Sequence, residues 1–125
     1  MFIIDINGNK IEKISSFTFS NLNSLQTLKL SNNEIKHIEK SAFHKLPKLK
    51  GIWLDKNKLE KIDEDLFRGL LNLERIDLSS NNLNFSDKKP ISLYLERIVE
   101  VVALQSYGDP LDIIRFVLNK VFIKI

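Results

Sequence analysis

The apolar and polar residues of this chain follow one pattern that returns every 24 residues. Two apolar residues alternate with a polar one, an asparagine follows, and further apolar residues come two and five places later, as in LKLSNNEIKHI at residues 28–38. A fixed period of this length is the signature of a repeat architecture, so we predict a stack of similar coils. The columns that align are Ile4, Leu28, Ile52 and Ile76; Ile6, Leu30, Leu54 and Leu78; Asn9, Asn33, Asn57 and Asn81; Ile11, Ile35, Leu59 and Leu83; Phe19, Phe43 and Phe67; Leu22, Leu46 and Leu70.

Each period is expected to form one coil of the stack. Leu28 and Leu30 alternate as on a short strand that sends both side chains into the core. The chain must then turn sharply, and a turn leaves backbone donors and acceptors that need partners. An amide side chain both donates and accepts, so Asn33 is predicted to bond backbone groups of its own coil and of the next.

The other three asparagines of that column are predicted to stack with Asn33 as a structural ladder. Phe43 and Leu46 should fill the far side of the coil. Because no coil can bury its apolar interior alone, neighbouring coils are expected to share one core, with their strands forming a parallel sheet.

The order L-x-x-L-x-L-x-x-N-x-L-x-x-L-x-x-x-x-F-x-x-L resembles the leucine-rich repeat family in its 24-residue, phenylalanine-containing form. Residues 25–48 and 49–72 match it fully, residues 1–24 match with Met1 in the first leucine column, and residues 73–85 match its first half. The resemblance implies an α/β leucine-rich repeat solenoid with a short parallel sheet on its concave face. It also implies a role in protein recognition, commonly in extracellular proteins or receptors of animal cells.

The last 40 residues depart from the repeat. Ser86 stands where an apolar residue is due, and SDKKP at residues 86–90 reads as a loop. Beyond it, apolar residues at helical spacing predict a helical capping tail over residues 86–125, while the β-branched run IVEVV keeps a strand as the alternative. The repeats, residues 1–85, and the tail are the two predicted parts of one domain.

Both ends lack the cysteine-bearing caps that secreted family members usually carry, because the chain has no cysteine. A fragment of a longer protein, an incomplete gene model and a small protein closed by its own tail all remain open. An uncapped coil at residues 1–24 also makes self-association through that end an expectation.

The composition and charge of the chain argue against several classes of function. Of 125 residues, 19 are basic and 16 acidic, and the two signs are interspersed, so no nucleic-acid stripe is predicted. No apolar run is long enough to cross a bilayer, and the start has no signal-peptide pattern. His37 and His44 lack a patterned acid, Asp63 to Asp65 lack the alternation of a calcium loop, and no cofactor or metal is predicted. We therefore expect a protein that is not an enzyme.

The candidate binding surface follows from strand alternation. If the fourth and sixth residues of each coil face inward, the third, fifth and seventh face out on the concave side. Trp53, the single tryptophan, is expected to project into open space there, with Gly51 leaving room for a partner's side chain. The predicted patch consists of Lys29, Trp53, Asp55, Arg75 and Asp77. A tryptophan packed on the aliphatic stem of Lys29 is the structural alternative.

A non-catalytic protein-binding module of an extracellular or receptor-type protein is thus the expected function, and an intracellular scaffold is the alternative. Asn84 begins an N-x-S sequon, which matters only if the chain enters the secretory pathway.

Overall fold

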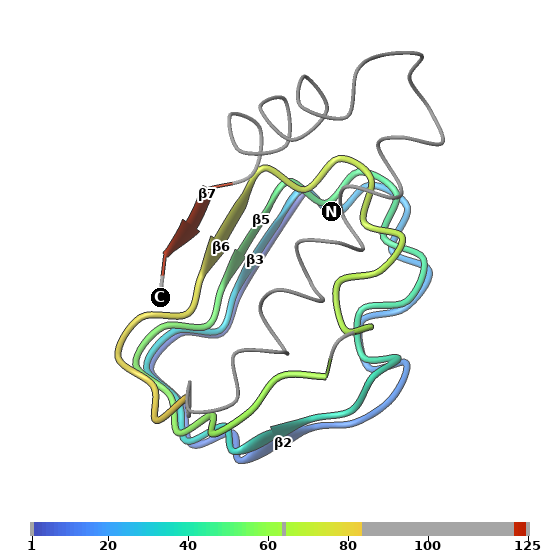
Figure 1. The fold of residues 1–125 in the computed structure, drawn as a ribbon. Helices are drawn as coiled ribbons and strands as arrows, with labels where there is room; N and C mark the ends of the chain where they lie inside the picture. Colours follow the sequence, from blue (N-terminus) through green and yellow to red (C-terminus); the bar gives the residue numbers. More distant parts are fainter. Residues whose placement is uncertain (1, 64, 84–121, 125) are drawn as a thin grey trace, which may run out of the picture.

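Parallel strands that recur every 24 residues organise the fold. The computed structural model describes residues 2–63, 65–83 and 122–124, and successive coils follow nearly the same path in it (Figure 1). One strand of each coil joins a five-stranded sheet of order β1-β3-β5-β6-β7. These strands are β1 (Ile3–Asp5), β3 (Thr27–Lys29), β5 (Gly51–Trp53), β6 (Arg75–Asp77) and β7 (Phe122–Lys124).

The register between these strands equals the sequence period. Ile4 pairs with Leu28, Leu28 with Ile52, and Ile52 with Ile76, all in parallel. After the corner, β2 (Lys13–Ile14) and β4 (His37–Ile38) form a second, two-stranded parallel sheet. It lies along a different side of the coil from the main sheet, where Figure 1 labels β2. The predicted solenoid with a parallel sheet is therefore confirmed for the described coils.

The core runs through the middle of the stack. Leu28, Ile52 and Ile76 are fully buried, as are the residues two places further on in the second and third coils. Phenylalanines fill the far side as a stack, with ring centroids 6.3 Å apart between Phe19 and Phe43 and 6.1 Å apart between Phe43 and Phe67. Aromatic burial of this kind contributes both area and ring stacking across coil boundaries.

The asparagine column joins neighbouring coils through the backbone. The Asn57 amide donates to the carbonyls of Leu54 and Asp55 in its own coil and of Leu30 in the preceding one, and it accepts from the Ile35 N–H. Asn33 and Asn81 repeat this set one coil earlier and one coil later.

The direction of these bonds corrects the prediction for Asn33. Its amide bonds the preceding coil, through Ile6 and Ile11, and not the next one. The reason is the direction in which the coils stack. The turn at residues 31–33 lies beside the carbonyl of Ile6, which directly follows the strand of the preceding coil. Asn9, at the start of the column, bonds the carbonyls of Ile6 and Asn7 in its own coil.

The corner before each asparagine has left-handed backbone geometry. Gly8, Asn32, Lys56 and Ser80 occupy the same place in successive coils, and all have φ between 55° and 70°. Glycine and asparagine adopt this region readily, whereas lysine and serine do so at a cost. In the first three coils the corner N–H offsets this cost by donating to a carbonyl of the next coil, as from Lys56 to Ser79 at 3.0 Å.

The C-terminal end of the chain corrects the prediction of a helical tail. Phe122–Lys124 form strand β7, which pairs in parallel with β6 so that Ile123 stands beside Ile76. Unpaired strand edges gain stability from any strand that pairs with them, and β6 offers such an edge. The helical prediction is therefore wrong for these three residues. The rest of the predicted tail, residues 86–121 and 125, lies outside the described residues.

Candidate functional site

One face of the main sheet points away from the core and forms the candidate site. Side chains of a strand alternate between the two faces, so the neighbours of the buried Leu28, Ile52 and Ile76 point outward. We call this side the open sheet face. Its described members are Ile3, Asp5 and Asn7; Thr27, Lys29 and Ser31; Gly51, Trp53 and Asp55; Arg75, Asp77 and Ser79.

Trp53 lies at the middle of the open sheet face, but its ring does not project into open space as predicted. The side chain is half-buried, and the indole folds back over Gly51. A Cβ atom added at Gly51 would come within 2.6 Å of ring carbon Cη2. The space at Gly51 is therefore filled by Trp53 itself, which corrects the expectation that it admits a partner's side chain.

Arg75 contacts the same ring from the neighbouring strand. Its guanidinium carbon lies 5.6 Å from the centroid of Trp53, within the range of a cation–π interaction, and Arg75 is exposed. Lys29 stands on the opposite side, in register with Trp53 on β3, and is half-buried. Two basic residues thus flank one aromatic ring across three adjacent strands.

Asp55 is oriented by a serine of the preceding coil. The Ser31 hydroxyl donates to Asp55 Oδ1 at 2.5 Å, and the Ser31 N–H donates to Asn7 Oδ1 at 2.7 Å. Hydrogen bonds to a carboxylate are short and strong, so the Asp55 side chain is held in place at the end of its strand. Sequence reasoning chose Asp55 but missed Ser31 and Asn7, although both occupy the same outward column.

Asp77 does not belong to the accessible surface, contrary to prediction. Only 6% of the residue is exposed, and its Oδ1 accepts from the Ser79 hydroxyl at 2.6 Å and from the Ser79 N–H at 3.0 Å. Asp77 lies on β6 between β5 and β7, where it pairs in register with Trp53 and with Lys124. The accessible residues of the predicted set are Lys29, Trp53, Asp55 and Arg75, which we call the Trp53 patch.

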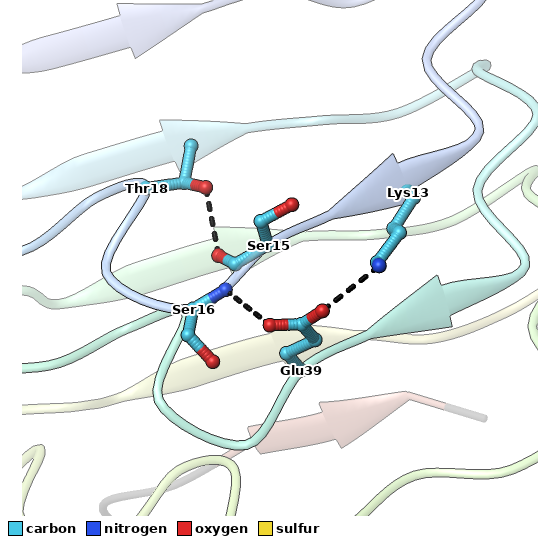
Figure 2. A network of polar contacts seen from close by, with 5 residues as sticks. All are labelled: Lys13, Ser15, Ser16, Thr18 and Glu39. Carbon is cyan, nitrogen blue, oxygen red and sulfur yellow. Dashed lines mark hydrogen bonds and ion pairs between the residues drawn. The ribbon is translucent and has the colours of Figure 1, made fainter.

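Glu39, a carboxylate with a lowered pKa, lies outside the open sheet face. Glu39 accepts a hydrogen bond from the Ser16 N–H at 2.8 Å and forms an ion pair with Lys13 at 2.9 Å (Figure 2). The Lys13 ammonium, followed by the Ser16 amide, lowers the pKa of Glu39 from 4.5 to about 2. Both partners belong to the preceding coil, so Glu39 fastens two coils together outside the core.

The remaining candidates for chemistry are scattered. His37 is exposed on β4, and exposed His44 stands edge-on to Phe17 with ring centroids 5.4 Å apart. Within residues 2–63, 65–83 and 122–124, no three His, Cys, Asp or Glu side chains gather as metal ligands.

The described part of the chain likewise has no helix that is long and apolar enough to span a membrane. Asn84, the sequon asparagine, lies outside the described residues.

Comparison with known protein families identifies the repeat. A family model described as leucine rich repeat matches residues 3–59 and again residues 47–92. No curated protein matches the chain. Repeats of this family are generally modules of protein–protein interaction, and they are typically not enzymes.

Proposed function

The chain belongs to the leucine-rich repeat family, and on that premise we propose that it is a non-catalytic module that binds a protein partner through the Trp53 patch. The observation that carries this proposal is the half-exposed indole held between Gly51 and Arg75. Tryptophan and arginine dominate the residues that lose most binding energy when truncated. A rigid ring that is already packed in the free protein also loses little entropy on binding.

The charges around the ring favour an acidic element on the partner. Lys29 and Arg75 place two positive charges beside Trp53 on the neighbouring strands, and Asp55 is the single carboxylate of the patch. Complementary charges raise the association rate and set the register of a complex. We therefore expect the partner to present a carboxylate beside an apolar group.

A differential capture experiment tests this function. The tagged full chain, its Trp53→Ala variant and its Leu71→Ala variant would each be used to retain proteins, which are then quantified by mass spectrometry. Leu71 is a matched control because it is exposed and lies in the turn before β6, outside the strands. The proposal requires a protein that wild type and Leu71→Ala retain equally and that Trp53→Ala loses. Equal retention by all three chains would contradict it.

The place where the module works is a further part of the proposal. The resemblance to phenylalanine-containing repeats of animal cell-surface proteins supports an extracellular or receptor-type setting, and an intracellular scaffold is the alternative. Occupancy of the Asn84 sequon separates the two. Expression of the natural gene in its own cells should yield a chain whose mass falls after treatment with an N-glycosidase, whereas an unglycosylated chain in the cytosolic fraction would support the scaffold.

A further inference from the structure

The outer edge of β1 has backbone groups available for pairing. Strand β1 stands at the end of the sheet order and pairs on its inner side with β3. Phe2 accepts from Gln26 and Thr27, and Ile6 donates to Lys29, so residues 2 and 6 direct these groups toward β3. Because successive residues of a strand direct their N–H and C=O groups to opposite sides, Ile3 and Asp5 direct theirs outward. This edge is a template for another strand.

Apolar side chains gather at the same end of the stack. Of the four exposed large hydrophobic residues in the described ranges, Phe2, Ile3 and Phe17 lie in residues 1–24, with 64%, 58% and 58% of each exposed. The inward column is incompletely covered there as well. Ile4 and Ile6 are partly buried, whereas Leu28 and Leu30, their equivalents one coil later, have no exposed surface. The described core is thus open at this end.

The charges of this end allow a second copy to approach. Residues 1–24 carry two acids and two lysines, and none of the four lies between residues 14 and 24. Residues 25–48, by contrast, carry five lysines and two glutamates. Two copies that meet at this coil therefore bring no net side-chain charge to the contact. A two-fold contact needs a surface that complements itself, and a neutral, apolar strand edge meets that condition.

We propose that two copies of this chain form a two-fold dimer through antiparallel pairing of β1 with β1 of the partner copy. The axis passes beside Ile4, so Ile3 lies opposite Asp5 of the partner copy and the two exchange both backbone hydrogen bonds. The main sheets then continue into each other. Since the axis is normal to the sheet, both Trp53 patches lie on one face of the dimer, which gives a bivalent surface with the gain in avidity that bivalency brings.

Sedimentation velocity of the full chain at increasing concentration tests the dimer. The expected mass rises from 14.5 kDa to twice that value. The Ile3→Asp variant places two carboxylates opposite each other at both symmetric positions, which should raise the dissociation constant by about tenfold or more. Ile3 is mostly exposed in the monomer, so the fold, followed by circular dichroism, should be retained.

A charge exchange tests the register. The double variant Ile3→Asp/Asp5→Lys places an acid opposite a lysine of the partner copy and should restore dimerisation, while Leu71→Asp, an exposed site away from the edge, should leave it unchanged. A chain that stays monomeric at every concentration would overturn the proposal. A dimer that Ile3→Asp does not weaken, or that the double variant does not restore, would overturn it too, since the contact would then use another surface or register. These measurements use no partner protein, so they stand or fall separately from the function proposed for the Trp53 patch.

Discussion

The indole of Trp53 rests on Gly51, two residues earlier on the same strand, and leaves no room there for a methyl group. This contact fixes which side of the ring faces solvent. It also makes Gly51 part of the candidate site, although a glycine has no side chain to offer a partner.

Substitution of Gly51 by alanine should move the ring. The methyl group would displace the indole from its resting place, at a cost of about 0.5–1.5 kcal/mol because the ring can swing away from the backbone. Tryptophan fluorescence should shift to longer wavelength as the ring becomes more exposed. Ile3→Ala, a change in the same column two strands away, should leave the emission unchanged; an unshifted spectrum in Gly51→Ala would show that the ring does not rest on the glycine.

The asparagines of the repeat should contribute more to stability where they are buried between coils than at the exposed first coil. Asn57→Ala leaves the carbonyls of Leu30 and Leu54 and the N–H of Ile35 without their partner, so we expect a loss of about 2–4 kcal/mol in the free energy of unfolding. Asn9→Ala removes bonds that are exposed and should cost about 1 kcal/mol or less. Urea unfolding of both variants measures the difference, and equal losses would contradict the ladder.

At one corner residue a substitution should stabilise the protein. Lys56 adopts φ of 56°, so Lys56→Gly should raise the free energy of unfolding by about 0.5–1 kcal/mol by relieving the left-handed strain. Lys58→Gly, two residues later, relieves no such strain and should lower stability by about the same amount. If both glycines destabilise the chain equally in urea, the corner is not strained.

The periodic part of this fold could be predicted because each column has one physical task. Leu28, Leu30 and Asn33 recur with their spacing intact, and a 24-residue shift places each on its equivalent, which predicts parallel strands in that register. Position along a strand also predicted that Lys29, Trp53 and Arg75 share the outward face. What a column cannot predict is where a flexible side chain settles, and the fold of Trp53 onto Gly51 depends on a rotamer that only three-dimensional packing selects.

Residues outside the period escaped prediction for a different reason. Strand β7 is three residues long and pairs with a strand more than 40 positions earlier. The three residues Phe122–Lys124 are too few to form a local pattern that predicts a strand. The burial of Asp77 was missed because strand alternation predicts which face of the sheet a residue lies on and not how far its neighbours cover it. Ser31 could have been found, since it shares a column with Asp55 and a hydroxyl there can reach the next coil.

The pH dependence of stability should report the link made by Glu39. Its pKa falls from 4.5 to about 2 on folding, so the stabilisation is fully present above about pH 4.5 and is lost as pH falls through 2. Thermal unfolding of wild type and Glu39→Gln should therefore differ at neutral pH and converge toward pH 2. Lys13→Met, which removes the largest cause of the shift, should show a weaker dependence over the same window; a constant difference down to pH 2 would contradict the assignment.

The central claim is that the Trp53 patch binds a protein, and titration calorimetry with the purified partner tests it most directly. Trp53→Ala should raise the dissociation constant about tenfold or more, Arg75→Ala should raise it less, and Leu71→Ala should leave it unchanged. Unfolding in urea should show that all three variants remain folded. A Trp53→Ala chain that is folded and binds its partner as tightly as wild type would contradict the claim.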